Sequence, residues 1–114
     1  MDELISSKEF KRLTDNREFM KKSRLNKAKQ IVLEAIDSAI TGSKNVGEVD
    51  DEKSVSLYYE ENNEIIVGTT NIKELLFSSK FPMEMFKEWL KSSGWELYIY
   101  EDTELVIIDI VTTE

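Results

Sequence analysis

Residues 95–110 read Trp95-Glu96-Leu97-Tyr98-Ile99-Tyr100-Glu101-Asp102-Thr103-Glu104-Leu105-Val106-Ile107-Ile108-Asp109-Ile110. Two runs rich in aromatic and β-branched residues flank a short acidic turn, which is the pattern of a β-hairpin. If Asp102 and Thr103 form the loop, Ile99 faces Val106 and Glu96 faces Asp109. One face is then wholly apolar, with Trp95, Leu97, Ile99, Val106, Ile108 and Ile110. We expect helices to cover this face.

An earlier stretch has the same pattern. Residues 54–59 and 64–69 are β-rich and flank Asn62-Asn63, and asparagine tolerates the positive φ of a tight hairpin turn. The alternation predicts a core side made of Val55, Leu57, Tyr59 and Ile66. It predicts an outer side made of Tyr58, Ile65 and Val67.

Helical periodicity fills most of the remaining chain. Residues 25–40 carry apolar side chains at three- and four-residue steps, and Gly42 follows as a helix stop. Ser6 and Glu9 have capping-box spacing for a first helix, which we expect to break near residues 14–16. Ile72–Phe77 has the length of one helical turn, and Pro82 suits the start of a helix that ends at Gly94.

These elements predict a single α+β domain over residues 1–114, in the order α(α)–β–β–(α)–α–β–β. We expect a four-stranded antiparallel sheet of two hairpins, with two to three helices packed on it. Residues 1–22 are interpreted as a basic N-terminal helical arm. Residues 42–53 are polar and contain glycine, so we expect a flexible loop there.

The composition excludes several classes of chemistry. The 114 residues include no cysteine and no histidine, which removes thiolate nucleophiles, Ser-His-Asp hydrolases and most zinc sites. Four glycines leave little room for a phosphate loop. We therefore expect a non-enzymatic protein with no cofactor and no metal. No apolar run is long enough to span a membrane and no signal peptide is recognisable, so a cytoplasmic protein is expected.

The predicted outer side of the sheet is the strongest candidate for function. Both hairpins expose tyrosines and aliphatic residues there, beside acidic turns. We predict that partner binding uses Tyr58, Val67, Tyr98, Tyr100, Ile107, Glu60, Glu61, Glu64, Glu101, Asp102 and Glu104. Three interpretations compete: the first helix covers the patch with Phe10, Leu13 and Met20; the patch binds a protein or a second copy; or it stacks on nucleic-acid bases. The surrounding carboxylates disfavour the last.

Two further interpretations concern the acidic residues. Glu96 opposite Asp109 is a like-charge pair, which is found at solvated strand ends or beside a lysine, and alternatively shares a divalent cation. The acidic turns either keep the surface soluble or imitate the phosphates of DNA toward a basic groove.

Positive charge is concentrated at the other end of the chain. Residues 1–29 hold nine Lys/Arg and five Asp/Glu, whereas residues 30–114 hold six and eighteen. An alternative function is therefore nucleic-acid binding through Lys8, Lys11, Arg12, Lys21, Lys22 and Arg24. The same residues also suit packing against an acidic patch of this chain or of a neighbouring subunit.

The segment from Phe86 to Tyr100, in which a helix ends at Gly94-Trp95 and runs into a C-terminal hairpin, resembles a pattern in small uncharacterised phage and prophage accessory proteins. The resemblance covers about a fifth of the chain and carries over no functional residues. It implies a phage-encoded inhibitor or modulator of a host protein, active in the host cytoplasm, or a homo-oligomeric minor virion or assembly protein.

Overall fold

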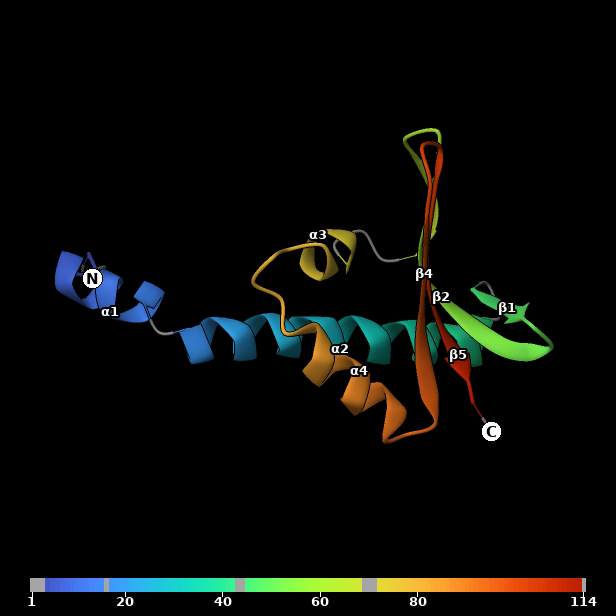
Figure 1. Ribbon diagram of the computed structural model, residues 1–114, viewed down its shortest axis with the longest axis horizontal. Helices are drawn as coiled ribbons and strands as arrows, with labels where there is room; N and C mark the ends of the chain where they lie inside the picture. Colours follow the sequence, from blue (N-terminus) through green and yellow to red (C-terminus); the bar gives the residue numbers. More distant parts are fainter. Residues whose placement is uncertain (1–3, 16, 43–44, 69–71, 114) are drawn as a thin grey trace.

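The computed structural model describes residues 4–15, 17–42, 45–68 and 72–113, with the backbone alone for 13–15, 17–20 and 67–68. The chain is an α+β domain, as predicted (Figure 1). Its helices are α1 (Ser7–Asp15), α2 (Arg17–Gly42), α3 (Ile72–Leu76) and α4 (Met83–Lys91). Its strands are β1 (Val46–Val49), β2 (Glu52–Glu61), β3 (Glu64–Gly68), β4 (Trp95–Glu101) and β5 (Leu105–Thr112).

The sheet is antiparallel, in the order β1-β2-β5-β4, and β3 also pairs with β2. β1 pairs with residues 52–55 of β2 and β3 pairs with residues 58–61, while β5 pairs along both segments. β1 and β3 therefore share the edge of β2 that β5 leaves open. In the part of the chain that the structure describes, the sheet has five strands, whereas four were expected.

The extra strand comes from the segment that we expected to be a flexible loop. Within residues 42–53, β1 and the start of β2 form a hairpin, so that interpretation is wrong. Asp50 and Asp51 form its turn with φ of 51° and 68°. Aspartate enters this left-handed region at a low cost because its short side chain bonds locally. The turn at Asn62 and Asn63 has similar positive φ values, 52° and 66°, and was predicted correctly.

The core lies between the sheet and α2, α3 and α4. The largest fully buried side chains are Phe86, Leu57, Ile72, Ile108, Ile110 and Val32. Helix α2 includes Gly42, which we expected to follow the helix as its stop, and the small residues Ala28, Ala35 and Ala39 are buried, which lets the helix approach its neighbours closely. The predicted apolar face of β4 and β5 is confirmed: Val106, Ile108 and Ile110 are buried, and the β4 residues Trp95, Leu97 and Ile99 pack against the core.

The register of the β4–β5 hairpin differs from the predicted one by two residues. Leu97 pairs with Ile110 and Ile99 pairs with Ile108, because the connection is longer than two residues. A shift of two residues keeps every side chain on its face, whereas a shift of one would exchange the faces. The predicted pair of Glu96 and Asp109 is wrong, since Glu96 faces Val111 and Asp109 faces Tyr98.

A β-bulge in β2 exchanges the positions of two tyrosines. Ser56 pairs with Asp109 and Tyr58 with Ile108, so Leu57 is an extra residue in β2. Tyr58 consequently turns to the core, where it is 4% exposed, and Tyr59 turns outward. The predicted outer position of Tyr58 is wrong. A second irregularity, between β2 and β3, accompanies the exposure of Ile66, which we expected in the core.

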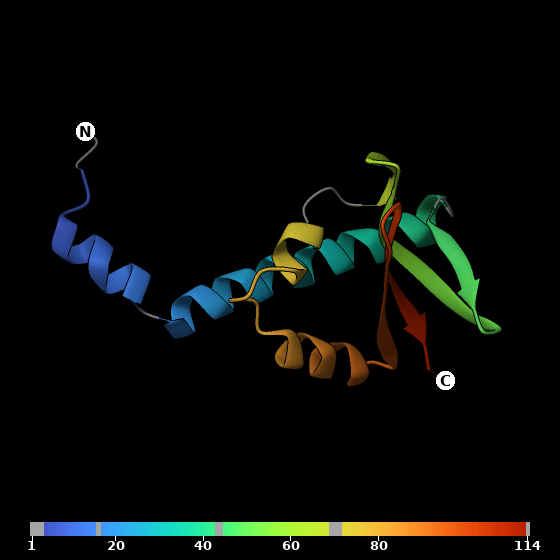
Figure 2. The ribbon, with the colours of Figure 1, turned by 45° about the horizontal axis from the view of Figure 1, so that its top comes forward.

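α1 ends at Asp15 and α2 begins at Arg17, where a break between two helices was expected. α1 lies beyond the end of α2 that is farther from the sheet (Figures 1 and 2). The molecule is elongated and measures 53 × 33 × 30 Å. Phe10 is exposed. The interpretation that the first helix covers the outer side of the sheet is therefore wrong; the side chains of Leu13 and Met20 lie outside the described residues.

Asn45 joins α2 to the open edge of β2. Its Nδ2 donates to the carbonyl of Ala35 at 2.9 Å and to that of Ser56 at 3.3 Å. The Ser56 amide in turn donates to the Asn45 carbonyl at 2.7 Å. The Asn45 side chain thus ties helix to sheet in the gap between β1 and β3.

We expect Asn45→Ala to lower the free energy of unfolding by about 1–3 kcal/mol, because the mutation leaves buried carbonyl groups without their donor. Chemical denaturation followed by circular dichroism measures the loss. The control is Asn26→Ala at an exposed position of α2, where no loss is expected. Equal stability of the two variants would contradict the role of Asn45.

Candidate protein-binding surface

The side of the sheet turned away from α3 and α4 carries a patch of tyrosine and aliphatic side chains. We call it the outer face; it consists of Tyr59, Tyr98, Tyr100, Leu105, Ile107 and Val111. Its central row is set by strand pairing, since Tyr59 pairs with Ile107 and Ile107 pairs with Tyr100. Residues paired in this way lie on the same face, so the two tyrosines flank Ile107.

The outer face is open to solvent. Tyr98 and Tyr100 are 38% and 42% exposed, and the other four side chains are half-buried by their neighbours in the sheet. In the view along the edge of the sheet, α3, α4 and most of α2 lie on the opposite side (Figure 1). Tyrosine combines a large rigid apolar ring with a polar tip, and is enriched where proteins bind one another.

The two acidic turns lie side by side at one end of the sheet. The Asn62 amide of the β2–β3 turn donates to the Glu104 carbonyl of the β4–β5 turn at 2.8 Å. We call this end the acidic tip; it consists of Glu60, Glu61, Glu64, Glu101, Asp102 and Glu104. Glu64, Glu101 and Glu104 are exposed and form no ion pair within the described part of the chain. Their negative charge therefore faces solvent.

Asp102 shapes its turn as well as adding charge. Its Oδ1 accepts the amides of Glu104 and Leu105 at 2.8 and 2.7 Å, and its Oδ2 accepts the Tyr100 hydroxyl at 3.1 Å. The two amides hold the pKa of Asp102 below its usual value, and the same carboxylate raises the pKa of Tyr100. The hydroxyl of Tyr100 is thereby held toward the acidic tip.

Glu60 belongs to the tip but is engaged on the helical side of the sheet. Its carboxylate accepts the Tyr58 hydroxyl and pairs with Lys73 of α3 at 2.9 Å. Burial, and next the bond to Glu60, raise the pKa of Tyr58 to about 12, while the bonds from Tyr58 and Lys73 lower the pKa of Glu60. The group fastens α3 to β2. It stabilises the fold, and Tyr58 is not part of the outer face.

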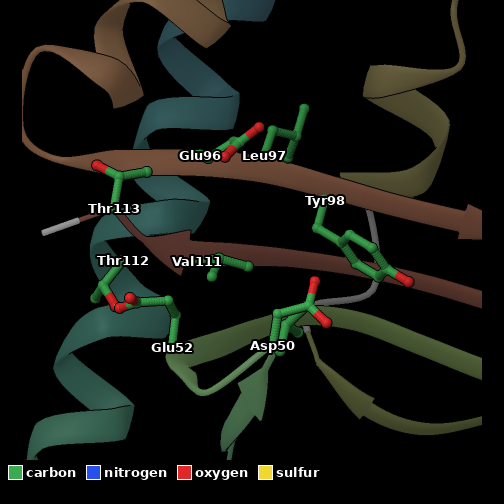
Figure 3. Close-up of a pocket in the computed structure, with 9 residues that line it drawn as sticks. Asp50, Glu52, Glu96, Leu97, Tyr98, Val111, Thr112 and Thr113 are labelled. Atoms are coloured by element: carbon green, nitrogen blue, oxygen red, sulfur yellow. The ribbon is translucent and has the colours of Figure 1, made fainter.

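An acidic hollow of about 370 Å³ lies at the other end of the outer face (Figure 3). It forms between the β1–β2 hairpin and the ends of β4 and β5, and it is lined by Val49, Asp50, Glu52, Glu96, Leu97, Tyr98, Val111, Thr112 and Thr113. The side chains of Asp50 and Tyr98 point toward one another, and Thr112 donates to Glu52 at 3.1 Å. Asp50 and Glu52, which we expected in a flexible loop, line this hollow instead.

Asp109 lies between the tip and the hollow and is half-buried. It pairs with Ser56 on one side and Tyr98 on the other. Its Oδ1 is enclosed without a hydrogen-bond donor among the described residues, and burial raises its pKa despite a bond from Ser56. A partly dehydrated carboxylate costs the fold stability. It also adds negative potential to the outer face.

The structure brings most of the predicted partner-binding residues together. Tyr98, Tyr100 and Ile107 share the outer face, and Glu61, Glu64, Glu101, Asp102 and Glu104 share the tip. Glu60 also lies at the tip, but its carboxylate bonds to Tyr58 and Lys73 on the helical side of the sheet. Tyr58 is buried, and its place is taken by Tyr59. The Cα of Val67 pairs with that of Tyr59, and its side chain lies outside the described residues.

The predicted nucleic-acid-binding residues lie on α1 and the first half of α2, away from the sheet (Figure 2). Lys8, Lys11, Arg12, Lys21 and Lys22 are exposed, whereas Arg24 is half-buried. Among the described residues, no cluster of acidic side chains has the arrangement of a metal site. Within the same residues, no helix has the length and apolar composition needed to cross a membrane.

Comparison of the chain with protein-family models, curated proteins and solved structures found no match. The candidate surface therefore has to be interpreted from its own geometry and charge.

The assignment of the tyrosines to the two faces predicts unequal effects of truncation. Tyr58→Ala removes a buried ring and is expected to lower the free energy of unfolding by about 3–5 kcal/mol. Tyr100→Ala removes a ring from the solvent-facing side together with its cross-strand contact to Ile107, and a smaller loss of about 1 kcal/mol is expected. Urea denaturation of both variants measures the difference. A Tyr100→Ala loss as large as that of Tyr58→Ala would show that Tyr100 is in a core.

The raised pKa of Asp109 predicts a pH-dependent gain from removing its charge. Folding favours the protonated form of Asp109. Its contribution to the stability of the fold is therefore fully present below its unfolded pKa of 3.8, and this contribution is lost as the pH rises through the folded pKa. Asp109→Asn should therefore raise the Tm at neutral pH and leave it unchanged near about pH 3. Thermal unfolding at both pH values tests this. A lower Tm at neutral pH would mean that the charge has a stabilising partner.

Proposed function

We propose that this protein is a non-catalytic protein-binding module that occupies a basic, partly apolar surface of another protein through its outer face, acidic tip and acidic hollow. The observation that carries the proposal is the exposure of Tyr98 and Tyr100 on an uncovered sheet face with acidic groups at both ends. Exposed aromatic rings supply affinity when they are dehydrated on binding. The carboxylates speed encounter with a basic partner and exclude acidic ones.

The distribution of charge supports this choice of partner. Residues 45–68 and 95–113, which form the strands and their turns, contain twelve Asp and Glu residues and one lysine, Lys53. A surface of this sign repels nucleic acids and attracts proteins rich in lysine and arginine, including those that bind DNA. The resemblance to phage accessory proteins suggests that the partner is a host protein in the host cytoplasm.

A photo-crosslinking amino acid placed at Tyr98 tests the proposal in an extract of the host cells. We expect an adduct with another protein from position 98 and none from the matched control position, Phe77, which is equally exposed but follows α3 on the helical side. The double variant Tyr98→Ala/Tyr100→Ala should weaken binding to the captured protein by about tenfold or more, because truncating central aromatic residues costs about 2 kcal/mol or more. Absence of an adduct at position 98, or the same adducts at both positions, would contradict the proposal.

A further inference from the structure

The N-terminal end of the molecule has the opposite character to the sheet. We define the basic arm as residues 4–12, with Lys21 and Lys22 at the start of α2. Over residues 4–22 the chain holds six Lys/Arg, including Lys8, Lys11, Arg12, Lys21 and Lys22, against three Asp/Glu, one of which, Glu9, pairs with Arg12. This end of the chain therefore has a net positive charge, whereas the outer face and its acidic ends are strongly negative.

The arm also exposes apolar side chains. Leu4 is 94% exposed and Ile5 is 47% exposed, directly before the Ser6 hydroxyl that caps α1 by accepting the Glu9 amide at 3.1 Å. Phe10 on α1 is 57% exposed. α1 has nine residues, and a helix shorter than about 12–15 residues is marginal in water without packing against another surface. A partner that covers these side chains would supply that packing.

The two surfaces cannot meet within one molecule. α1 lies at one extreme of the long axis and the sheet lies toward the other, in both views (Figures 1 and 2). A second copy, however, presents the outer face and the acidic tip to the arm of the first. Leu4 and Ile5 match the tyrosine–aliphatic patch, and the lysines match the carboxylates of the tip.

We propose that the basic arm of one copy docks on the outer face of a second copy, so that the chains associate head to tail. This inference rests on the proposed function, because it names a second copy as an occupant of the outer face. Two different surfaces meet in such a contact, so it repeats from copy to copy and forms either a closed ring or an open chain. A foreign partner must then compete with the arm of a neighbouring copy.

Three triple variants separate this contact from any other mode of association. The arm variant carries Leu4→Ser, Lys8→Gln and Lys21→Gln. The face variant carries Tyr100→Ser, Glu101→Gln and Glu104→Gln. The matched control carries Phe77→Ser, Lys87→Gln and Glu88→Gln, which are exposed positions on and after the helices that cover the other side of the sheet. All nine positions are exposed, and circular dichroism checks that each variant is folded.

Sedimentation of the full chain measures the association. We expect the wild type and the control to exceed the 13.3 kDa of one chain at about 0.15 M salt, and to return to it at about 1 M, where the Debye length falls from about 8 Å to about 3 Å. The arm variant and the face variant should each sediment as one chain. Their equimolar mixture should form a species of two chains and nothing larger, since one intact arm meets one intact face.

Three results would overturn the inference. The first is a wild type that sediments as a single chain under all conditions. In that case, an adduct between position 98 and a foreign protein would still support the proposed function. Association that persists in either triple variant, or that the mixture fails to restore, would indicate a different contact between copies. Retardation of DNA or RNA by the wild type and not by the arm variant, without self-association, would make nucleic acid the occupant of the arm.

Discussion

β5 is the strand on which the arrangement depends, because it is hydrogen-bonded along both edges and alternates strictly between two environments. Val106, Ile108 and Ile110 are buried beneath the helices, while Leu105, Ile107 and Val111 remain half-buried on the other side. A helix covers only one side of a sheet, so the second set of apolar residues stays near solvent. The outer face follows directly from this alternation.

The bulge at Leu57 determines how the neighbouring strand contributes. It allows β2 to bury Val55, Leu57 and Tyr58 together and to present Tyr59 beside Ile107. Tyr58 then bonds to Glu60, which pairs with Lys73 and so fixes α3. One extra residue thus separates a tyrosine that stabilises the fold from one that belongs to the surface.

The sequence was informative wherever a short-range rule decides the outcome. The faces of β4 and β5 were predicted correctly although the register was not, because a two-residue shift preserves the side-chain period. The Asn62-Asn63 turn follows from the local backbone preference of asparagine. The bulge in β2 depends on packing against β5, and the residue types in Ser54–Tyr59 do not predict it. The Asp50-Asp51 turn lacks the glycine or asparagine that usually marks a hairpin, so β1 and the acidic hollow were missed.

Charge is divided between the two ends of an elongated molecule, and the apolar side chains at each end remain exposed. Both features support the proposal that the chain binds another protein. Nitration of the tyrosines in the dilute native chain, read at each residue by mass spectrometry, tests most directly whether the outer face is open. Tyr98 should react readily while Tyr58 reacts only after unfolding. Equal reactivity of Tyr58 and Tyr98, or protection of both, would contradict this account.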